Sequence, residues 1–274
     1  MSFIEHTVDG VAYMTAANIG AVHAFSMRLG GVSDGMYRSL NLGIGSGDDF
    51  ALVRENYEIF CRSLGISIDS LVGTRQVHGS HIRIVTLSDC GKLFTQEPLE
   101  ADGMITGEPG VALIVFTADC TPILLHDPVC GVIAAVHSGW RGTASDIVGE
   151  AVRKMTGEFG CSPVQIKAAI GPCISKCCYE TDSDVVEALR KRLDDSVENC
   201  LVAREEKYMV DLKEANRLLL TRAGLVDISV SDECTSCLSD KYWSHRRTNG
   251  KRGSQAALIM RNAECGIRNK GIDL

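Results

Sequence analysis

A cysteine and a histidine lie near the two ends of an apolar segment in the middle of the chain. The segment runs from Val115 to Gly142 and reads VFTADCTPILLHDPVCGVIAAVHSGWRG. Apolar strands normally lead into turns of glycine, serine or aspartate, but here Cys120 precedes one apolar run and His137 closes the next. A thiolate and an imidazole held close together can bind a transition metal, or act as nucleophile and base. The sequence therefore predicts a metal-binding or catalytic site at one end of this segment.

The residues between the two apolar runs predict a β-hairpin. The sequence HDPVCG contains aspartate, proline and glycine, which favour a turn. With the turn centred between Pro128 and Val129, Cys120 lies directly opposite His137 at the open end of the hairpin. Cross-strand Cβ atoms lie about 4.5–5.5 Å apart, so both side chains can reach one ion at about 2.0–2.3 Å.

A third ligand is available upstream, in GTRQVHGSHIRIV. His78 precedes a glycine at the entrance to a predicted strand, whereas His81 lies within the start of that strand. A single histidine near a strand is more often structural than a ligand, and we select His78 because a Cys/His pair already needs a partner. His126 lies at the turn end of the hairpin, too far away. We therefore predict a metal site of His78, Cys120 and His137.

A candidate anion site follows the second apolar run. The sequence SGWRGTASDIVGEAVRKMTGEF places Arg141 and free backbone N–H groups at a strand–loop–helix junction. Both attract anions. The arginines of WSHRRTNGKRG form a second candidate.

The chain contains twelve cysteines, and they are scattered along it. In a reducing compartment, we expect most of them to be free thiols that pack as small hydrophobic side chains. Two clusters, CISKCC and CTSC, could supply a structural zinc site, but the first has C-x3-C rather than C-x2-C spacing. We do not predict zinc there. Whether a second metal binds is left open for these cysteines: Cys173, Cys177, Cys234 and Cys237.

Hydrophobic periodicity defines the elements that position these residues. Strand-like runs outnumber helix-like runs, and several strands follow one another without a helix between them. This order predicts an α+β protein with mixed β-sheets flanked by helices, and the absence of linkers or repeats predicts one domain over residues 1–274. The predicted strands are 22–27, 82–86, 111–116, 121–126, 131–137, 166–170, 226–230 and 255–260. The predicted helices are 49–64, 145–159, 182–193 and 211–223.

The composition excludes several classes of function. The chain is 45% hydrophobic and 23% charged, with a net charge of −7, which argues against nucleic-acid phosphates as the main ligand. No apolar run approaches the ~20 residues that span a bilayer. The start of the chain, MSFIEHTVDG, lacks the basic and apolar regions of a signal peptide. We expect a cytoplasmic protein that binds neither nucleic acid nor membranes, and the oligomeric state is left open.

Six motifs occur in the order found in the laccase-domain family: TRQVHG, EADGMIT, TADCTPILLHD, AAVHSGWRGT, AAIGPCISKCCYE and WSHRRTNGKRG. The chain resembles this family over nearly its whole length, although it has SHRR where the family more often has SYRR. The family was first labelled multicopper polyphenol oxidase and is now described as a zinc-dependent purine nucleoside phosphorylase. The resemblance implies the same zinc ligands as the spacing predicts, His78, Cys120 and His137.

The resemblance also implies an activity. Adenosine, inosine, guanosine and methylthioadenosine would be cleaved with phosphate, and adenosine would be deaminated. Three zinc ligands leave one coordination position for water, which suits deamination. Phosphorolysis needs phosphate near C1′ and a proton or hydrogen bond on the departing purine. Besides Cys120 and His137, the residues we select are Asp119 for proton transfer and Arg141, Ser138, Asn41 and Gln76 for phosphate or substrate.

Three other functions are possible for a protein with these residues. Cys120 and His137 could be the nucleophile and base of a cysteine hydrolase, and the availability of His78 favours the metal site instead. Two histidines and a cysteine also describe a copper site. A multicopper phenol oxidase, however, needs many histidines, typically in H-x-H pairs, whereas this chain has seven histidines and no such pair. A non-catalytic binding module is disfavoured because the three ligands converge at strand ends.

Overall fold

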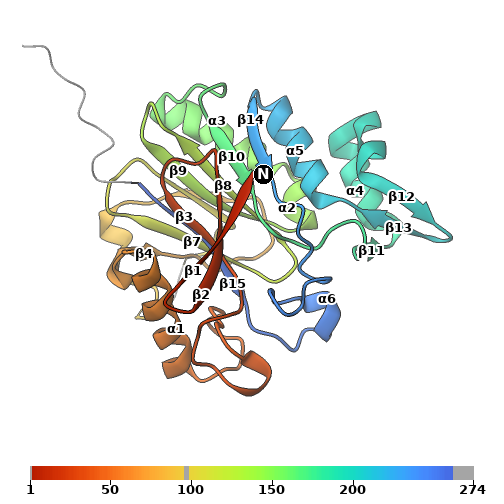
Figure 1. Cartoon of the computed structure of the whole chain (residues 1–274). Coiled ribbons are helices and arrows are strands. Elements are labelled where there is room, and N and C mark those ends of the chain that lie inside the picture. Colours follow the sequence, from red (N-terminus) through yellow and green to blue (C-terminus); the bar gives the residue numbers. More distant parts are fainter. Residues whose placement is uncertain (1, 96–98, 262–274) are drawn as a thin grey trace, which may run out of the picture.

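Two six-stranded β-sheets pack against each other at the centre of the molecule (Figure 1). The structure is a computed structural model that describes residues 2–95 and 99–261. The strands are β1 (Phe3–Val8), β2 (Val11–Ala16), β3 (Val22–Ser26), β4 (Leu71–Val72), β5 (Ile82–Ile84), β6 (Gly103–Thr106), β7 (Ala112–Thr117), β8 (Thr121–Asp127), β9 (Val132–Ser138), β10 (Lys167–Ile170), β11 (Glu180–Thr181), β12 (Leu201–Arg204), β13 (Lys207–Val210), β14 (Asp227–Val230) and β15 (Gln255–Met260).

Both large sheets are mixed. The first has the order β1-β2-β3-β15-β7-β4 and the second β14-β10-β8-β9-β6-β5, while β11, β13 and β12 form a small third sheet. The pairs β4–β7, β5–β6 and β10–β14 are parallel. The other paired neighbours in the two large sheets are antiparallel.

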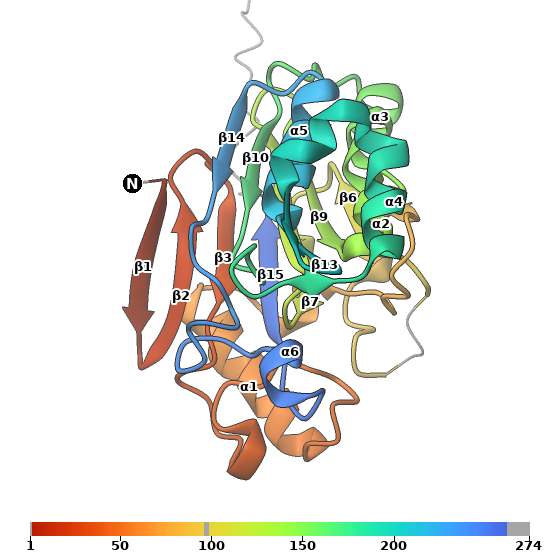
Figure 2. The ribbon, with the colours of Figure 1, turned by 90° about the vertical axis from the view of Figure 1, so that its right-hand side faces the viewer.

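Helices cover the outer faces of both sheets. The α-helices are α1 (Phe50–Ser63), α2 (Trp140–Ala144), α3 (Ile147–Phe159), α4 (Ser183–Leu193), α5 (Leu212–Arg222) and α6 (His245–Thr248), and the 3-10 helices are Gly35–Tyr37, Ile68–Ser70, Leu87–Asp89 and Asp194–Cys200. Helix α1 packs on the first sheet, whereas α3, α4 and α5 pack on the second. Figure 2 shows these three helices on one side of the molecule and β1, β2 and β3 on the other. Within the described ranges, no helix combines the length and apolarity needed to cross a membrane.

The predicted fold class, α+β with mixed sheets flanked by helices, is confirmed. All eight predicted strands and four predicted helices are present, with ends that differ by two residues at most. The second helix starts late because Asp146 caps it, accepting a hydrogen bond from the Gly149 N–H at 3.1 Å. The hairpin of β1 and β2 was not predicted, although its turn is Asp9–Gly10, a dipeptide typical of two-residue hairpin turns.

The central hairpin of β8 and β9 has a different register from the predicted one. His137 pairs with Pro122 rather than with Cys120. The turn holds four residues instead of two, because the Asp127 carboxylate closes it by accepting hydrogen bonds from two backbone N–H groups, at 2.8 and 2.9 Å. Cys120 therefore lies just before β8, after Asp119, whose φ of 89° turns the chain.

His126 lies at the turn end of this hairpin, as predicted, and takes no part in the site. Its side chain is 4% exposed, and its Nδ1 has no hydrogen-bond partner among the described residues. Burial lowers the pKa of His126 to about 4, although the charge of Asp127 opposes the shift. His126 is therefore a neutral histidine at neutral pH.

The stability of the protein in acid should depend on His126. Because its pKa is about 4 in the folded chain and 6.5 when unperturbed, the unfolded chain binds the additional proton as pH falls below 6.5. The linked loss of stability reaches about 3 kcal/mol near pH 4. Leucine cannot titrate, so His126→Leu should lose about 3 kcal/mol less unfolding free energy than the wild type between about pH 7 and pH 4. Urea unfolding of both proteins, with chelator present, measures this difference, and identical pH profiles would contradict it.

Candidate metal centre and pocket

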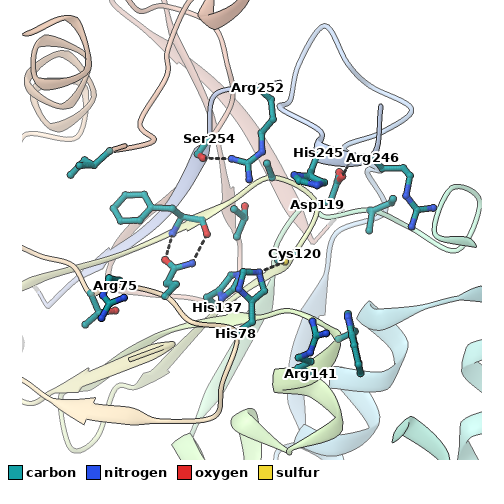
Figure 3. A pocket seen from close by; sticks show the side chains of 18 of the residues that line it. Arg75, His78, Asp119, Cys120, His137, Arg141, His245, Arg246, Arg252 and Ser254 are labelled. Carbon is teal, nitrogen blue, oxygen red and sulfur yellow. Dashed lines mark hydrogen bonds between the residues drawn. The ribbon is translucent and has the colours of Figure 1, made fainter. Parts of the chain in front are cut away.

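His78, Cys120 and His137 converge at one end of the second sheet (Figure 3). His137 lies at the end of β9, Cys120 immediately precedes β8, and His78 lies in the loop between β4 and β5. One ligand atom from each lies within 4.8 Å of the other two, and the Cys120 Sγ is 3.8 Å from the His78 Nε2. The three residues predicted from the sequence therefore lie together, and they could hold one metal ion.

The carboxylate of Asp102, just before β6, holds two of these residues in place. Asp102 is fully buried. Its Oδ1 accepts hydrogen bonds from the His78 backbone N–H and from the His137 Nδ1, both at 2.9 Å, and its Oδ2 accepts from the Gly79 N–H at 2.7 Å. The bond to Nδ1 leaves Nε2 of His137 free to act as a ligand, an arrangement common around metal-binding histidines. Asp102 was not predicted as a site residue.

The charges in the centre favour a thiolate at Cys120. Burial raises the pKa of this thiol, but the charge of His137 and hydrogen bonds from His137 and His78 lower it to about 6. Burial lowers the pKa of His137, but the Cys120 charge and the bond to Asp102 raise it to about 9. Burial also raises the pKa of Asp102, and its bonds to His137 and the 78–79 backbone bring it below the ordinary value. The thiolate is the form of cysteine that binds a metal.

A cavity of about 910 Å³ opens beside these three ligands. A volume of this order is typical of small-molecule sites. Its apolar wall comes from both halves of the chain and includes Phe50, Leu93, Phe94, Phe116 and Trp140. Its basic side chains are Arg75, Arg141, Arg246 and Arg252. The cavity can therefore receive a ligand that combines a flat apolar group with an anion.

Arg141 and Gln76 line the cavity, as predicted for substrate-binding residues. The Arg141 guanidinium lies 4.2 Å from the ring centre of Trp140 and forms no salt bridge within the described part of the chain. The side-chain amide of Gln76 donates to the Phe116 carbonyl at 2.8 Å and accepts from the Phe116 N–H at 2.7 Å. Arg141 is thus available to an anion, whereas Gln76 already pairs with the edge of β7.

Asn41 and Ser138, which the sequence analysis also selected for phosphate or substrate, are not among the residues that line the cavity. Both side chains are fully buried. The Asn41 amide oxygen accepts hydrogen bonds from the backbone N–H groups of Gly43 and Ser254, both at 2.9 Å. The Ser138 hydroxyl bonds to Asn216 Oδ1 at 2.9 Å. Asn41 therefore joins the loops at Gly43 and Ser254, whereas Ser138 joins β9 to α5.

Asp119 lines the cavity, but its carboxylate is occupied by protein donors. It accepts hydrogen bonds from the Thr235 hydroxyl at 2.7 Å, the Ser244 hydroxyl at 3.1 Å and the Arg246 N–H at 2.7 Å. These donors come from the segment between β14 and α6 and from the start of α6. Asp119 therefore joins this segment to Cys120.

The WSHRRTNGKRG segment contributes three residues to the cavity, His245, Arg246 and Arg252 (Figure 3). Arg252 donates to the Ser254 hydroxyl at 2.7 Å, and its Nε is buried without a partner among the described residues. Burial lowers the pKa of Arg252, and the charges of Cys120 and Asp119 oppose this shift. The sequence indicated this segment as a second anion candidate, and its residue Arg252 lines the cavity.

The chain belongs to the family described as multi-copper polyphenol oxidoreductase laccase, whose family model matches residues 22–262. A purine nucleoside phosphorylase from Geobacillus stearothermophilus, YlmD, is 40% identical over 253 residues, which cover 89% of this chain and 92% of that protein. A purine nucleoside phosphorylase from Deinococcus radiodurans is 37% identical over 255 residues, covering 92% and 94%. The crystal structure of YlmD from G. stearothermophilus is similar with a TM-score of 0.88 at 38% identity, covering 92% of this chain and 96% of that one. The resemblance seen in the sequence is confirmed.

Asp102→Asn should weaken metal binding without unfolding the protein. The asparagine amide would face backbone donors and lacks the charge that balances His137. We expect roughly a 10- to 100-fold loss of metal affinity and about 2–4 kcal/mol of lost stability. Competition with a fluorescent chelator measures the affinity.

Asp127→Asn is the matched control for this experiment. Asp127 is also fully buried and accepts two backbone N–H bonds, but it lies at the turn of the β8–β9 hairpin, at the other end from Cys120 and His137. The Asp127→Asn substitution should leave the affinity of the His78–Cys120–His137 centre for metal unchanged. An equal loss of affinity in both variants would show that the effect of Asp102 is one of general stability.

Proposed function

We propose that the protein is a zinc-dependent purine nucleoside phosphorylase. It would convert adenosine, inosine, guanosine or methylthioadenosine, with phosphate, into the free base and the ribose 1-phosphate. The observation that carries the proposal is the convergence of His78, Cys120 and His137 beside a cavity large enough for a nucleoside. The relatives named purine nucleoside phosphorylase support it. We take residues 1–274 as one domain of this type, acting in the cytoplasm.

The donor set of one thiolate and two imidazoles fits zinc. Bound there, zinc would supply a Lewis acid and an open coordination position next to the cavity. Copper is the second candidate because of the name of the family model. With seven histidines in the chain and two of them at this site, few remain to build a copper cluster, so we favour zinc.

The side chains around the cavity match the needs of phosphorolysis. The reaction requires phosphate held at C1′ of the nucleoside, and an environment that stabilises the charge that develops on the departing purine. Arg141 is free to bind phosphate, and Arg252 adds a second positive charge to the cavity wall. Phe116 and Trp140 provide apolar surface against which the base can pack and from which water is excluded. Asp119 positions the segment that carries Arg246.

Adenosine deamination at the same centre is a proposed side activity. Water bound at an open metal position suits attack on C6 of adenine. A metal-free cysteine hydrolase remains the competing hypothesis, because Cys120 has a lowered pKa and lies next to His137. Metal analysis separates the two mechanisms, since only the phosphorylase proposal requires the metal.

Cys120→Ala should remove one equivalent of metal per chain and abolish base release. The fold should persist, because Cys120 lies at the end of a strand rather than in the core between the sheets. Elemental analysis, circular dichroism and release of hypoxanthine from inosine measure the three effects. Cys90→Ser, which changes a half-buried thiol outside the centre, should leave metal and activity unchanged. Copper in place of zinc, together with oxygen uptake on phenols, would support the oxidase instead.

Arg141→Ala should raise the KM for phosphate while metal content stays constant. Loss of one hydrogen bond from a charged donor removes about 1.5–3 kcal/mol of binding, which corresponds to roughly a 10- to 100-fold increase in KM. Arg153→Ala is the control, because Arg153 is an exposed arginine on α3 that pairs with Glu150. Base release that proceeds equally well without phosphate would identify a hydrolase.

A further inference from the structure

The loops that follow β10 and β14 run side by side because these strands are parallel neighbours. The pairing continues beyond the strands, where Cys173 and Cys234 form an isolated parallel bridge and the Thr235 N–H donates to the Cys173 carbonyl at 3.1 Å. The two cysteine clusters of the sequence, CISKCC and CTSC, are thereby brought together. This place is separate from the centre of His78, Cys120 and His137.

Four cysteine sulfur atoms meet between these loops. The Sγ atoms of Cys177, Cys178, Cys234 and Cys237 all lie within 4.8 Å of one another. Cys237 Sγ is 3.5 Å from Cys177 Sγ and 3.4 Å from Cys178 Sγ, and the latter two are 3.8 Å apart. Around a tetrahedral zinc with bonds of about 2.3 Å, neighbouring sulfur atoms lie about 3.8 Å apart. The group is therefore close to the size of a tetrathiolate site.

The backbone around Cys234 is arranged to stabilise a negatively charged sulfur. The Cys234 Sγ accepts a hydrogen bond from the Ser175 N–H at 3.3 Å. Hydrogen bonds from N–H groups favour the charged form of an acceptor, and the two-residue gap of CTSC is the one used by many zinc-binding loops.

Three cations attached to these loops have no carboxylate partner among the described residues. Lys213 is 6% exposed, and its Nζ donates to one hydroxyl and two backbone carbonyls of the loops. Arg246 donates to the Cys178 carbonyl and Arg247 to the Ser236 carbonyl, both at 3.2 Å. Lys213 is the buried one of the three, and a buried cation without a counter-ion is costly, whereas Arg246 and Arg247 are exposed. Four thiolates around one Zn²⁺ would carry a net charge of −2 close to Lys213.

We propose that Cys177, Cys178, Cys234 and Cys237 bind a structural zinc ion. Zn²⁺ would replace the four thiol protons without any change of oxidation state, and four protein ligands leave no open position for a substrate. Cys178 takes the place that the C-x3-C spacing gave to Cys173. The Cys173 side chain is instead buried and accepts a hydrogen bond from the Thr121 hydroxyl at 3.4 Å.

This zinc would fix one wall of the cavity. The first loop carries Ile174 and Tyr179, which line the cavity, and the second carries Thr235, which holds the Asp119 carboxylate. Bonds from both loops to the same zinc ion would therefore hold the loop after β10 and the loop after β14 in a fixed position relative to Cys120. Zinc binding by these four cysteines does not depend on whether the cavity binds nucleosides.

The experiment counts zinc per chain in protein purified under reducing conditions without added metal. With both sites filled, the wild type should contain two equivalents. The double variant Cys177→Ser/Cys237→Ser should lose one equivalent, and combining it with Cys120→Ala should remove the second. The control Cys90→Ser should retain the wild-type content. A double variant with as much zinc as the wild type would overturn the proposal.

Cobalt provides a second measurement that does not depend on the stability of the double variant. Metal-stripped Cys120→Ala protein, titrated with Co²⁺, should develop the intense thiolate-to-cobalt charge-transfer absorption of a tetrahedral site with four thiolates. Absence of this absorption would overturn the proposal. Iron in the wild type that is lost from the double variant would overturn the choice of zinc.

Discussion

The carboxylate of Asp102 accepts hydrogen bonds from His137 and from the backbone that carries His78, and it does so while fully buried. A buried charge is unfavourable unless its donors are in place. Here the donors belong to the two segments that carry the candidate ligands His78 and His137, so the desolvation cost is offset only when both segments are correctly placed. The same bonds stabilise the φ of 60° at His78, a conformation that costs a non-glycine residue about 1–2 kcal/mol. The geometry of the centre therefore follows from the need to supply hydrogen-bond donors to the buried Asp102 carboxylate.

The packing of the two sheets decides what surrounds this centre. His137 lies on β9 of the second sheet and Cys120 immediately precedes β8, whereas Phe116 lies on β7 and Ser254 immediately precedes β15 of the first. Because the sheets pack face to face, the cavity is built across their ends, with metal ligands on one side and aromatic surface on the other. The Gln76 side chain extends the pairing at this edge of the first sheet. It forms two hydrogen bonds with the Phe116 backbone beyond the end of the two-residue strand β4. The loops thus determine which ligand fits, while the sheets hold the ligating atoms.

The sequence predicted the elements well because periodicity reflects burial, and the buried faces of β8 and β9 are almost wholly apolar. It also predicted which three residues would meet, although the register that led to Cys120 and His137 was wrong by two positions. Asp102 was missed because a carboxylate that bonds to a loop some 24 residues away leaves no local pattern. Asn41 and Ser138 looked like substrate contacts from their positions near motifs, but their hydrogen bonds point into the protein. The group of four neighbouring cysteines contains Cys178 rather than Cys173. The pairing beyond β10 buries the Cys173 side chain away from the other sulfur atoms.

The separation of the ligands along the chain also determines the order of events during folding. His78 and Cys120 are 42 positions apart, and Cys177 and Cys237 are 60 apart. Loops of this length must be closed before either group of ligands is assembled, and the entropy lost in closing them is recovered through the long-range pairing of the sheets rather than through the metal. Metal capture would therefore be a late step that follows formation of the sheets, and each ion bound would add stability by mass action to a chain that has already folded.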